Sequence, residues 1–283
     1  MKIGLINLAL TLYKNGVFSD VKSLMDMGTK ELRVSFNDLK YSLDQANIKI
    51  KNNKFNILKK FPKGKRISTE NLWSLLNIKK YQCIDINKSN KSIYLDLNYP
   101  LTKKSLISKF DLVNDFGNNE HVFNIGEAYK TMYKMCKKNG LIWINQSVYG
   151  GNGFYHFDQS FFEGFAAANS LTILHMAYVL NIGAYKQFLI PCDKDLLAQF
   201  DRNKISNIDI SCVFRKKTNN EFKYFYQYNA NNNQKPFFQT FINSNYPPEK
   251  VYIPTKKRSE YIRLAKKGDE FSKTWLRSFG YKI

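Results

Sequence analysis

Residues 110–123 read FDLVNDFGNNEHVF, an apolar run followed by a polar loop with a single glycine. The run Phe110–Phe116 has the length and composition of a buried strand. It precedes a helical pattern over Val122–Lys138, and a second apolar run, Leu141–Ser147, follows the helix stop signal Asn139-Gly140. A succession of strand, helix and strand predicts parallel pairing through a right-handed crossover.

Three more apolar runs, all nearer the N-terminus, have the length of short buried strands, and each contains or ends near an aspartate. They are Val21–Met27 with Asp26, Tyr81–Ile86 with Asp85, and Ser92–Leu97 with Asp96. Toward the C-terminus, Ile208–Arg215 and Glu221–Tyr228 are joined by a turn-rich segment and predict an antiparallel hairpin. The fold class that follows is α/β: a Rossmann-like, mostly parallel sheet with helices on both faces and a C-terminal antiparallel hairpin.

The remaining segments predict the domain organisation. The apolar stretch Ile3–Tyr13 indicates an N-terminal helical cap over residues 1–20, because no small-residue cleavage site follows it as in a signal peptide. The α/β domain is expected to cover residues 21–230, with a basic insertion at 30–66. Residues 231–283 form a basic C-terminal extension.

Composition excludes several classes of protein. The chain has 283 residues, of which 43% are hydrophobic and 15% aromatic, so it is long and apolar enough for a sizeable core and is not a disordered chain. Its four cysteines stand far apart and form no CxxC pair, which indicates reduced thiols in a cytoplasmic protein and no metal site. No apolar run reaches the roughly 18 residues that a membrane span needs.

The three aspartates define the first candidate site. In an open parallel sheet, ligands bind outside the carboxyl ends of the strands. A carboxylate after the second strand, Asp85, can accept from both hydroxyls of a ribose, and one a strand further on, Asp96, can accept from an adenine amine. The patterns GxxxxGK[ST] and GxGxxG are absent, so the acids predict an adenosine pocket and not a phosphate pocket. For each acid alone, a helix cap or turn residue is the alternative interpretation.

At these positions the sequence resembles a known family. The segments that carry the resemblance are LMDMG at 24–28, YQCID at 81–85, LDLN at 95–98 and FDLVNDFGNNEHV at 110–122. Together they are similar to the class I, Rossmann-like S-adenosylmethionine-dependent methyltransferases, in a branch with an FDLV-x-x-FG-x-x-EH segment. The resemblance covers roughly residues 15–230 and implies S-adenosylmethionine as cofactor and a small-molecule or sugar-like hydroxyl or amine as methyl acceptor.

The resemblance also implies roles for single residues. Asp26 and Gly28 would approach the methionine moiety, Asp85 would hold the ribose, and Asp96 or Leu97 would face the adenine. Asn114 and Asp115 would lie beside the sulfonium, and Glu120 and His121 at the mouth of the acceptor site. Two positions depart from the family: Lys30 stands where a second glycine is common, and Asn152 where this branch often carries a histidine. The cofactor's carboxylate end is therefore expected to be held differently, or more weakly.

Methyl transfer to a hydroxyl or amine benefits from a general base, and histidine, with an ordinary pKa near 6.5, suits that role. His121, with Glu120 beside it, is the first candidate, and His156, in the segment GFYHFD, is the second. An alternative role for His121 is to orient its loop by bonding backbone groups. His175 lies in an apolar run and is expected to be a core residue.

The charge balance leaves other functions open. Lys and Arg number 44 against 23 Asp and Glu, a formal net charge of +21. The clusters Lys51–Arg66 and Lys256–Lys267 are of the kind that neutralises phosphates, so a nucleic-acid-binding protein or RNA methyltransferase is one alternative. Because lysines are spread over the whole chain, a compositional bias toward Lys, Asn and Ile is favoured instead. Lys30 keeps a third class open, a non-catalytic Rossmann-like scaffold.

Overall fold

The computed structural model describes residues 1–48, 67–87, 92–182, 186–198, 205, 207–226, 237–238, 262–263 and 265–268. The cluster Lys51–Arg66 lies outside the described residues, as does most of the predicted C-terminal extension. In the described part of the chain, no helix is long and apolar enough to cross a bilayer.

A mixed sheet forms the centre of the molecule. Within the described residues its strand order is β11-β8-β10-β7-β6-β1-β4-β5, and β9 pairs with β8. The parallel half consists of β1 (Ser23–Met27), β4 (Lys80–Asp85), β5 (Ser92–Tyr94), β6 (Phe110–Phe116) and β7 (Cys136–Tyr149). The other half consists of β8 (Leu171–Ile182), β9 (Lys186–Pro191), β10 (Asn207–Lys216) and β11 (Phe237–Phe238). There β10 runs antiparallel to both β7 and β8.

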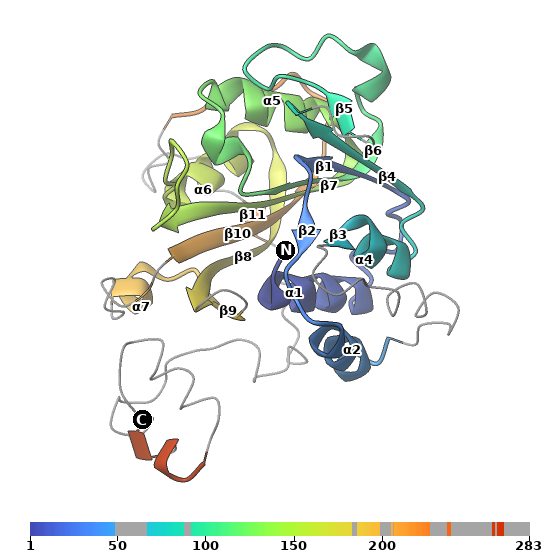
Figure 1. Ribbon diagram of the computed structural model, residues 1–283. Coiled ribbons are helices and arrows are strands. Elements are labelled where there is room, and N and C mark those ends of the chain that lie inside the picture. The colour runs from blue at the N-terminus through green and yellow to red at the C-terminus, as the bar shows by residue number, and fades with distance from the viewer. Residues whose placement is uncertain are drawn as a thin grey trace.

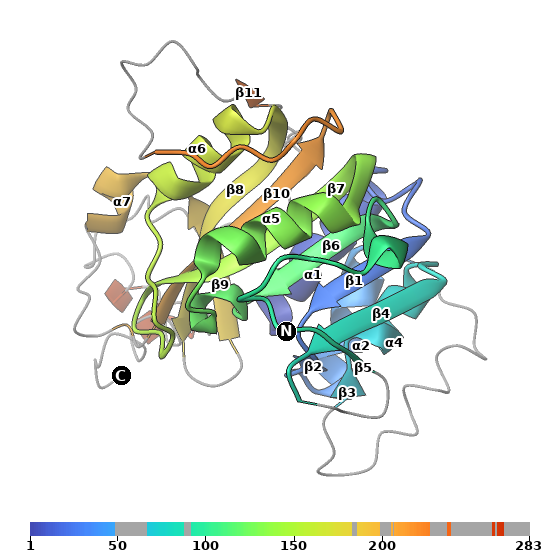
Figure 2. The same cartoon turned by 90° about the horizontal axis from the view of Figure 1, so that it is seen from above.

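Helices cover both faces of this sheet, as Figures 1 and 2 show. One face carries α5 (Ile125–Met135) and α6 (Gln159–Ala168). The other carries α1 (Ile3–Lys14), α2 (Phe36–Gln45) and α4 (Glu70–Leu75), with the short ribbon of β2 (Glu31–Leu32) and β3 (Ile67–Ser68) beside them. The short elements η1 (Lys104–Leu106), η2 (Asn119–His121) and α7 (Lys194–Ala198) lie in the connections.

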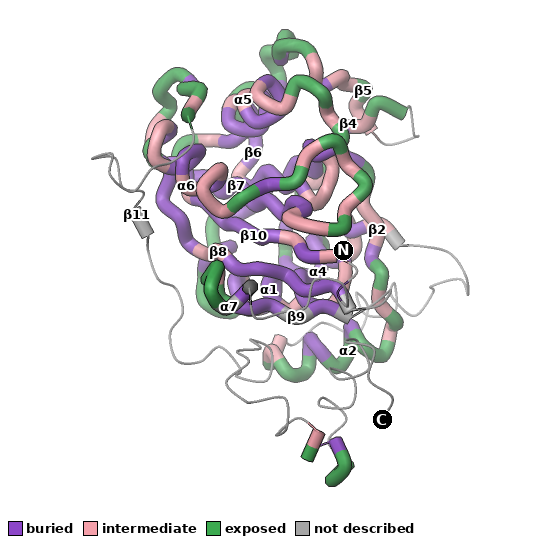
Figure 3. Tube along the Cα trace, turned by 90° about the vertical axis from the view of Figure 1, so that its left-hand side faces the viewer, coloured by how far each residue is buried: buried purple, intermediate pink, exposed green. Residues whose placement is uncertain are grey.

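Alternation along the central strands explains why two hydrophobic cores form. Leu24 and Leu112 belong to the core under α1, whereas Met25 and Val113 belong to the core under α5. Because successive strand residues point to opposite faces, a strand covered on both sides is apolar throughout. Figure 3 shows the resulting buried centre of the sheet.

The predicted fold class is confirmed: the sheet is mostly parallel at its N-terminal half, helices lie on both faces, and antiparallel strands close it. The predicted strand at Phe110–Phe116 agrees with β6 residue for residue, and α1 lies within the predicted cap.

Two local predictions were wrong. The pair Asn139-Gly140 does not stop a helix, because α5 already ends at Met135 and the pair lies in an irregularity of β7. Asn139 adopts a φ of 63° there, in the left-handed region that asparagine tolerates.

The second strand of the predicted hairpin is also absent from its described part: residues 221–226 form no strand. Phe222 and Phe225 instead pack on Phe165 of α6 at ring distances of 6.2 and 6.0 Å. The antiparallel partners of β10 are β7 and β8.

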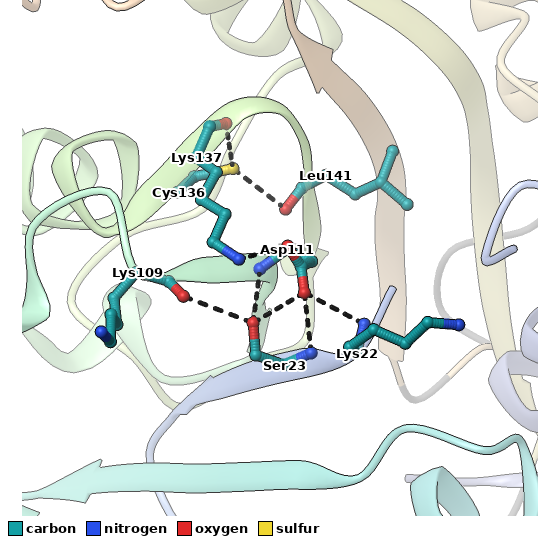
Figure 4. A network of polar contacts seen from close by, with 7 residues as sticks. All are labelled: Lys22, Ser23, Lys109, Asp111, Cys136, Lys137 and Leu141. Atoms are coloured by element: carbon teal, nitrogen blue, oxygen red, sulfur yellow. Dashed lines mark hydrogen bonds and ion pairs between the residues drawn. The ribbon is translucent and has the colours of Figure 1, made fainter. Parts of the chain in front are cut away.

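At the amino edge of the sheet, Asp111 joins three strands (Figure 4). Its Oδ2 accepts hydrogen bonds from the backbone amides of Lys22 (3.0 Å) and Ser23 (2.9 Å) and from the Ser23 hydroxyl (2.8 Å), and its Oδ1 pairs with Lys137 Nζ at 2.7 Å. Burial alone would raise the pKa of Asp111, but the partners Lys137, Ser23 and Lys22 outweigh it and hold the pKa below its ordinary value.

Candidate functional site

The loops after β1 and β6 meet where the strand order reverses. β1 lies between β4 and β6, so the chain leaves it at the switch point of the parallel half. Gly28 follows β1 with a φ of +107°, and a Cβ there would lie 2.5 Å from Oδ1 of Asn118 in the loop after β6. Only glycine fits both the backbone conformation and this approach.

Asp85 ends β4 and faces the same loop. Its Oδ2 accepts hydrogen bonds from the amide (3.2 Å) and hydroxyl (2.8 Å) of Thr29, and its Oδ1 accepts from the amide of Asn87 (2.9 Å). Burial would raise the pKa of Asp85, but these bonds outweigh it and lower the pKa, so the group is a carboxylate at neutral pH. The side chain is only half-buried and each oxygen has lone pairs to spare, so it can accept ligand hydroxyls.

Asp26 lies fully buried on β1, on the face that carries α4. Its Oδ2 accepts from the hydroxyl of Thr69 at 2.9 Å, and its Oδ1 has no partner among the described residues. Burial raises the pKa of Asp26, and the Thr69 bond opposes the rise. Asn114 is its register neighbour on β6, and both polar atoms of the Asn114 side chain are buried without a described partner. The side chains of Asn114 and Tyr81 also act on the Asp26 carboxylate and oppose the rise of its pKa, so Asp26 and Asn114 are polar neighbours inside the sheet.

Asp115 points to the opposite face, next to α5, because it directly follows Asn114 in the strand. Its carboxylate accepts from the amides of Asn118 (3.0 Å) and Asn119 (3.3 Å) and from the side chain of Gln146. Burial raises its pKa to about 7, opposed by the charge of Lys30 and by the two amides. Asp115 therefore holds the loop after β6, and the structure separates it from Asn114.

The hydrogen bonds of Asp96 do not involve Asp26 or Asp85. Its Oδ1 accepts from the amide and the side chain of Asn98, both at 2.9 Å. Asn98 in turn bonds Asn124, the residue that caps α5. Asp26 and Asp85 share one face of neighbouring strands, whereas the hydrogen bonds of Asp96 to Asn98 are those of a turn residue.

Glu120 ties together the loops after β6 and β7. Its Oε2 accepts from the amide of Ser147 at 2.8 Å, and its backbone oxygen accepts from the amide of Phe154 at 2.7 Å. Its Oε1 lies 3.7 Å from Nε2 of His121, whose side chain is 45% exposed. Gly153 permits the approach, because a Cβ there would lie 2.7 Å from the Glu120 backbone oxygen.

The other two histidines are separate from this pair. His156 is exposed in the loop after β7, 3.4 Å from the backbone oxygen of Gly151. His175 lies in the middle of β8, its Nε2 is buried without a described partner, and burial lowers its pKa to about 4. It is therefore a neutral, half-buried histidine, and it belongs to neither hydrophobic core.

A cavity of about 600 Å³ opens at the same edge, on the face that carries α1. Its lining is mostly polar and includes Glu120, His121, Asn145, Asn152, Asn181 and Asp209. Oδ2 of Asp209 accepts from the side-chain amides of Asn145 (3.1 Å) and Asn181 (2.9 Å), and burial raises the pKa of Asp209 to about 6 against these bonds.

Asn145, Asn181 and Asp209 were not predicted from the sequence. Asp209 starts an antiparallel strand, and only the pairing of β10 between β7 and β8 brings that start to the carboxyl edge. In the sequence, the polar residues at the ends of β7 and β8 are the feature that could have indicated this part of the site.

Comparison with known proteins adds little. No family model and no curated protein matches the chain. Among solved structures it is similar to the 1,6-didemethyltoxoflavin-N1-methyltransferase of Burkholderia thailandensis, with 10% identity, a TM-score of 0.41, and 75% of this chain and 79% of that chain covered. It is also similar to an S-adenosylmethionine-dependent methyltransferase of Thermotoga maritima, with 11% identity, a TM-score of 0.32, and 75% and 92% covered.

A third similar structure is the [4+2]-cyclase SpnF, with 13% identity, a TM-score of 0.35, and 74% and 80% covered. With TM-scores below 0.5 in all three cases, these likenesses support no statement about the activity of this chain.

Proposed function

We propose that the protein transfers a methyl group from S-adenosylmethionine to a hydroxyl or amine of a small or sugar-like molecule. The observation that carries the proposal is the half-buried carboxylate of Asp85 at the end of β4, bonded to Thr29 in the loop after β1. A carboxylate at that point of an open sheet lies beside the crevice where ligands bind, and its oxygens can accept both hydroxyls of a ribose.

The strand order supports the same proposal. Passing outward from the switch point, the parallel strands β6 and β7 are followed by the antiparallel β10 and then by β8. This order resembles the sheet of the class I methyltransferases, the family that the sequence resembles. The support is at the level of the fold, since one fold hosts many activities.

The residues at the switch point fit the proposed cofactor. S-adenosylmethionine carries a sulfonium, an ammonium group, a carboxylate and a ribose diol, so it needs acceptors and at least one cation. Asp85 would hold the diol, Asp26 and Asn114 would lie on the methionine side, and Lys30 would supply a cation. Gly28 lets the backbone come close. Asp96 would act near the adenine by holding the turn at Asn98, and Asp115 would act near the sulfonium by holding the loop after β6.

The bound cofactor supplies an electrophilic methyl group on a sulfonium. As the acceptor oxygen or nitrogen took up this methyl group and the C–S electron pair stayed on sulfur, a residue of the protein would accept the proton of the acceptor. His121 is the proposed base, since it lines the cavity and Glu120 lies beside its ring; His156 is the second candidate. Positioning of the acceptor by the loops after β6 and β7 supplies the rest.

Calorimetry with S-adenosylhomocysteine, the demethylated product, tests the proposal. We expect the wild type to bind it, and Asp85→Ala to bind at least about tenfold more weakly, which corresponds to about 1.4 kcal/mol, because a carboxylate contact to the ribose is charge-assisted. Asp85→Asn keeps the shape and removes the charge, and should also weaken binding. Asp20→Ala, at an exposed turn after α1, is the matched control and should leave the affinity unchanged.

Unchanged affinity in both Asp85 variants would remove Asp85 from the site. No binding to the wild type at millimolar concentration would favour the non-catalytic scaffold.

A further inference from the structure

The polar cavity has a basic side. Lys2 at the start of α1, Lys30 after β1 and Arg33 after β2 all line it. Among the described residues none of the three forms an ion pair, and the one hydrogen bond of the Lys2 ammonium goes to a neutral group, Oδ1 of Asn181, at 2.9 Å. Burial lowers the pKa of Lys2; the charge of Asp209 opposes this and the charge of Arg33 adds to it. The carboxylates of Glu31, Glu120 and Asp209 line the same cavity, but within the described part of the chain none of them forms an ion pair with the three cations. The cations therefore favour an anionic group on the ligand.

Within the described residues, the wall formed by Asn145 and Asp209 lacks a hydrogen-bond donor. Asn145 is 6% exposed, and its side-chain nitrogen is already bonded to Asp209. Its Oδ1 is buried and has no partner in the described part of the chain. Both side-chain hydrogen bonds to Asp209 end on Oδ2. A ligand hydroxyl or amine at this wall would satisfy the Asn145 oxygen and reach the free side of Asp209.

We propose that this cavity binds the methyl acceptor, and that the acceptor carries an oxyanion, a carboxylate or a phosphate, held by Lys2 and Arg33. Its hydroxyl or amine donor faces Asn145 and Asp209. That the ligand is the methyl acceptor rests on the proposed function, but the oxyanion site is defined by the cavity itself. An apolar acceptor is disfavoured, because it would leave Lys2 and Arg33 without an anionic partner and the buried Asn145 oxygen without a donor.

Binding of inorganic phosphate, followed by ³¹P NMR on the full chain with and without S-adenosylhomocysteine, tests the inference. We expect saturable binding to the wild type and binding at least about tenfold weaker to the double variant Lys2→Gln/Arg33→Gln, because charge-assisted bonds are lost. The control Lys14→Gln/Lys104→Gln removes the same charge from exposed positions away from the cavity and should bind as the wild type does. A parallel titration with acetate shows whether a carboxylate or a phosphate fits better.

The inference is overturned by equal phosphate affinity in the two double variants, or by the lack of saturable binding to the wild type. Both variants change exposed or half-buried polar positions, and circular dichroism checks that they fold. Failure of the proposed function is read separately: S-adenosylhomocysteine then fails to bind the wild type, whatever the phosphate titration shows.

Discussion

Gly28 is the residue at which backbone conformation and site geometry coincide. Its φ of +107° is open to glycine and costly for other residues, and Asn118 leaves no room for a Cβ. Gly16 offers a comparison: its φ is +74°, but a Cβ there would meet no heavy atom within 4 Å. Gly28 is therefore required by its backbone conformation and by the close approach of Asn118, whereas Gly16 is required by its backbone conformation alone.

We therefore expect Gly28→Ala to lower the free energy of unfolding by more than about 2 kcal/mol and to weaken S-adenosylhomocysteine binding, because the loops after β1 and β6 must separate. Gly16→Ala should cost about 1 kcal/mol and leave binding intact. Urea unfolding and calorimetry measure both. Equal losses in the two variants would show that Asn118 does not press on Gly28.

The positions of candidate residues in the fold were predictable where they follow successive parallel strands. Asp26, Gly28 and Asp85 stand at the ends of parallel strands, and their alternation along the chain indicates one edge. Asp209 was not predictable, because its position depends on the register of an antiparallel strand about 60 residues from β7 in the chain. The separation of Asn114 from Asp115 was predictable from alternation alone.

Among the elements, α5 depends on one buried lysine of β10. Lys216 is 2% exposed, and its Nζ donates to the backbone oxygens of Tyr133 and Cys136, both at 2.8 Å, and lies 4.0 Å from the centre of the Tyr133 ring. These oxygens are at the end of the helix, where carbonyls lack partners and a cation is favourable.

Lys216→Met should therefore lower the free energy of unfolding by about 2 kcal/mol, since two charge-assisted bonds are lost and two buried carbonyls are left unpaired. The neighbouring Lys217 is not buried, and Lys217→Met should change stability by less than about 0.5 kcal/mol. Chemical denaturation of the two variants gives the comparison. Indistinguishable midpoints would mean that Lys216 does not cap α5.

The amino ends of β1, β6 and β7 depend on the carboxylate of Asp111. Its folded-state pKa is lowered below the unfolded value near 3.9, so its stabilising contribution is present above that value and is lost as the pH falls through the folded pKa. We expect Asp111→Asn to be less stable than the wild type at pH 7 by about 1–3 kcal/mol, and the difference to shrink below about pH 4.

Unfolding measured from pH 7 to pH 2.5 checks this, with Asp44→Asn as control, because Asp44 makes only an exposed helix pair with Lys40. A difference that stays constant over this range would contradict the role given to the charge of Asp111.

Secondary structure was predictable where a run of residues suits a buried strand, and it was mispredicted where tertiary packing determines the backbone conformation. β6 has the length of a buried strand, its apolar residues pack on both faces, and its bounds agree with those expected from the sequence. The run 221–226 alternates like a strand, yet its phenylalanines join the aromatic cluster over α6, and no strand forms. β7 begins at Cys136, directly after α5, and Asn139 and Gly140 lie within the strand where its pairing with β6 is irregular.

At the scale of the whole molecule, each half of the sheet contributes different residues to the candidate site. The parallel half brings Asp26, Gly28 and Asp85 to one edge, and the antiparallel half adds Asn181 and Asp209 beside the N-terminus of α1. The net charge of +21 is a property of the whole chain and does not identify the ligand. In the function proposed above, cofactor and acceptor would therefore lie next to each other at a single edge of the sheet, with residues of the loop after β1 at both sites.

A crystal structure of the protein with S-adenosylhomocysteine tests this placement most directly. We predict the ribose hydroxyls within hydrogen-bond distance of the Asp85 carboxylate, and the homocysteine end over Gly28. Density for the nucleoside on another face of the sheet, or a crevice that stays filled by the Asn118 side chain at saturating ligand, would contradict it.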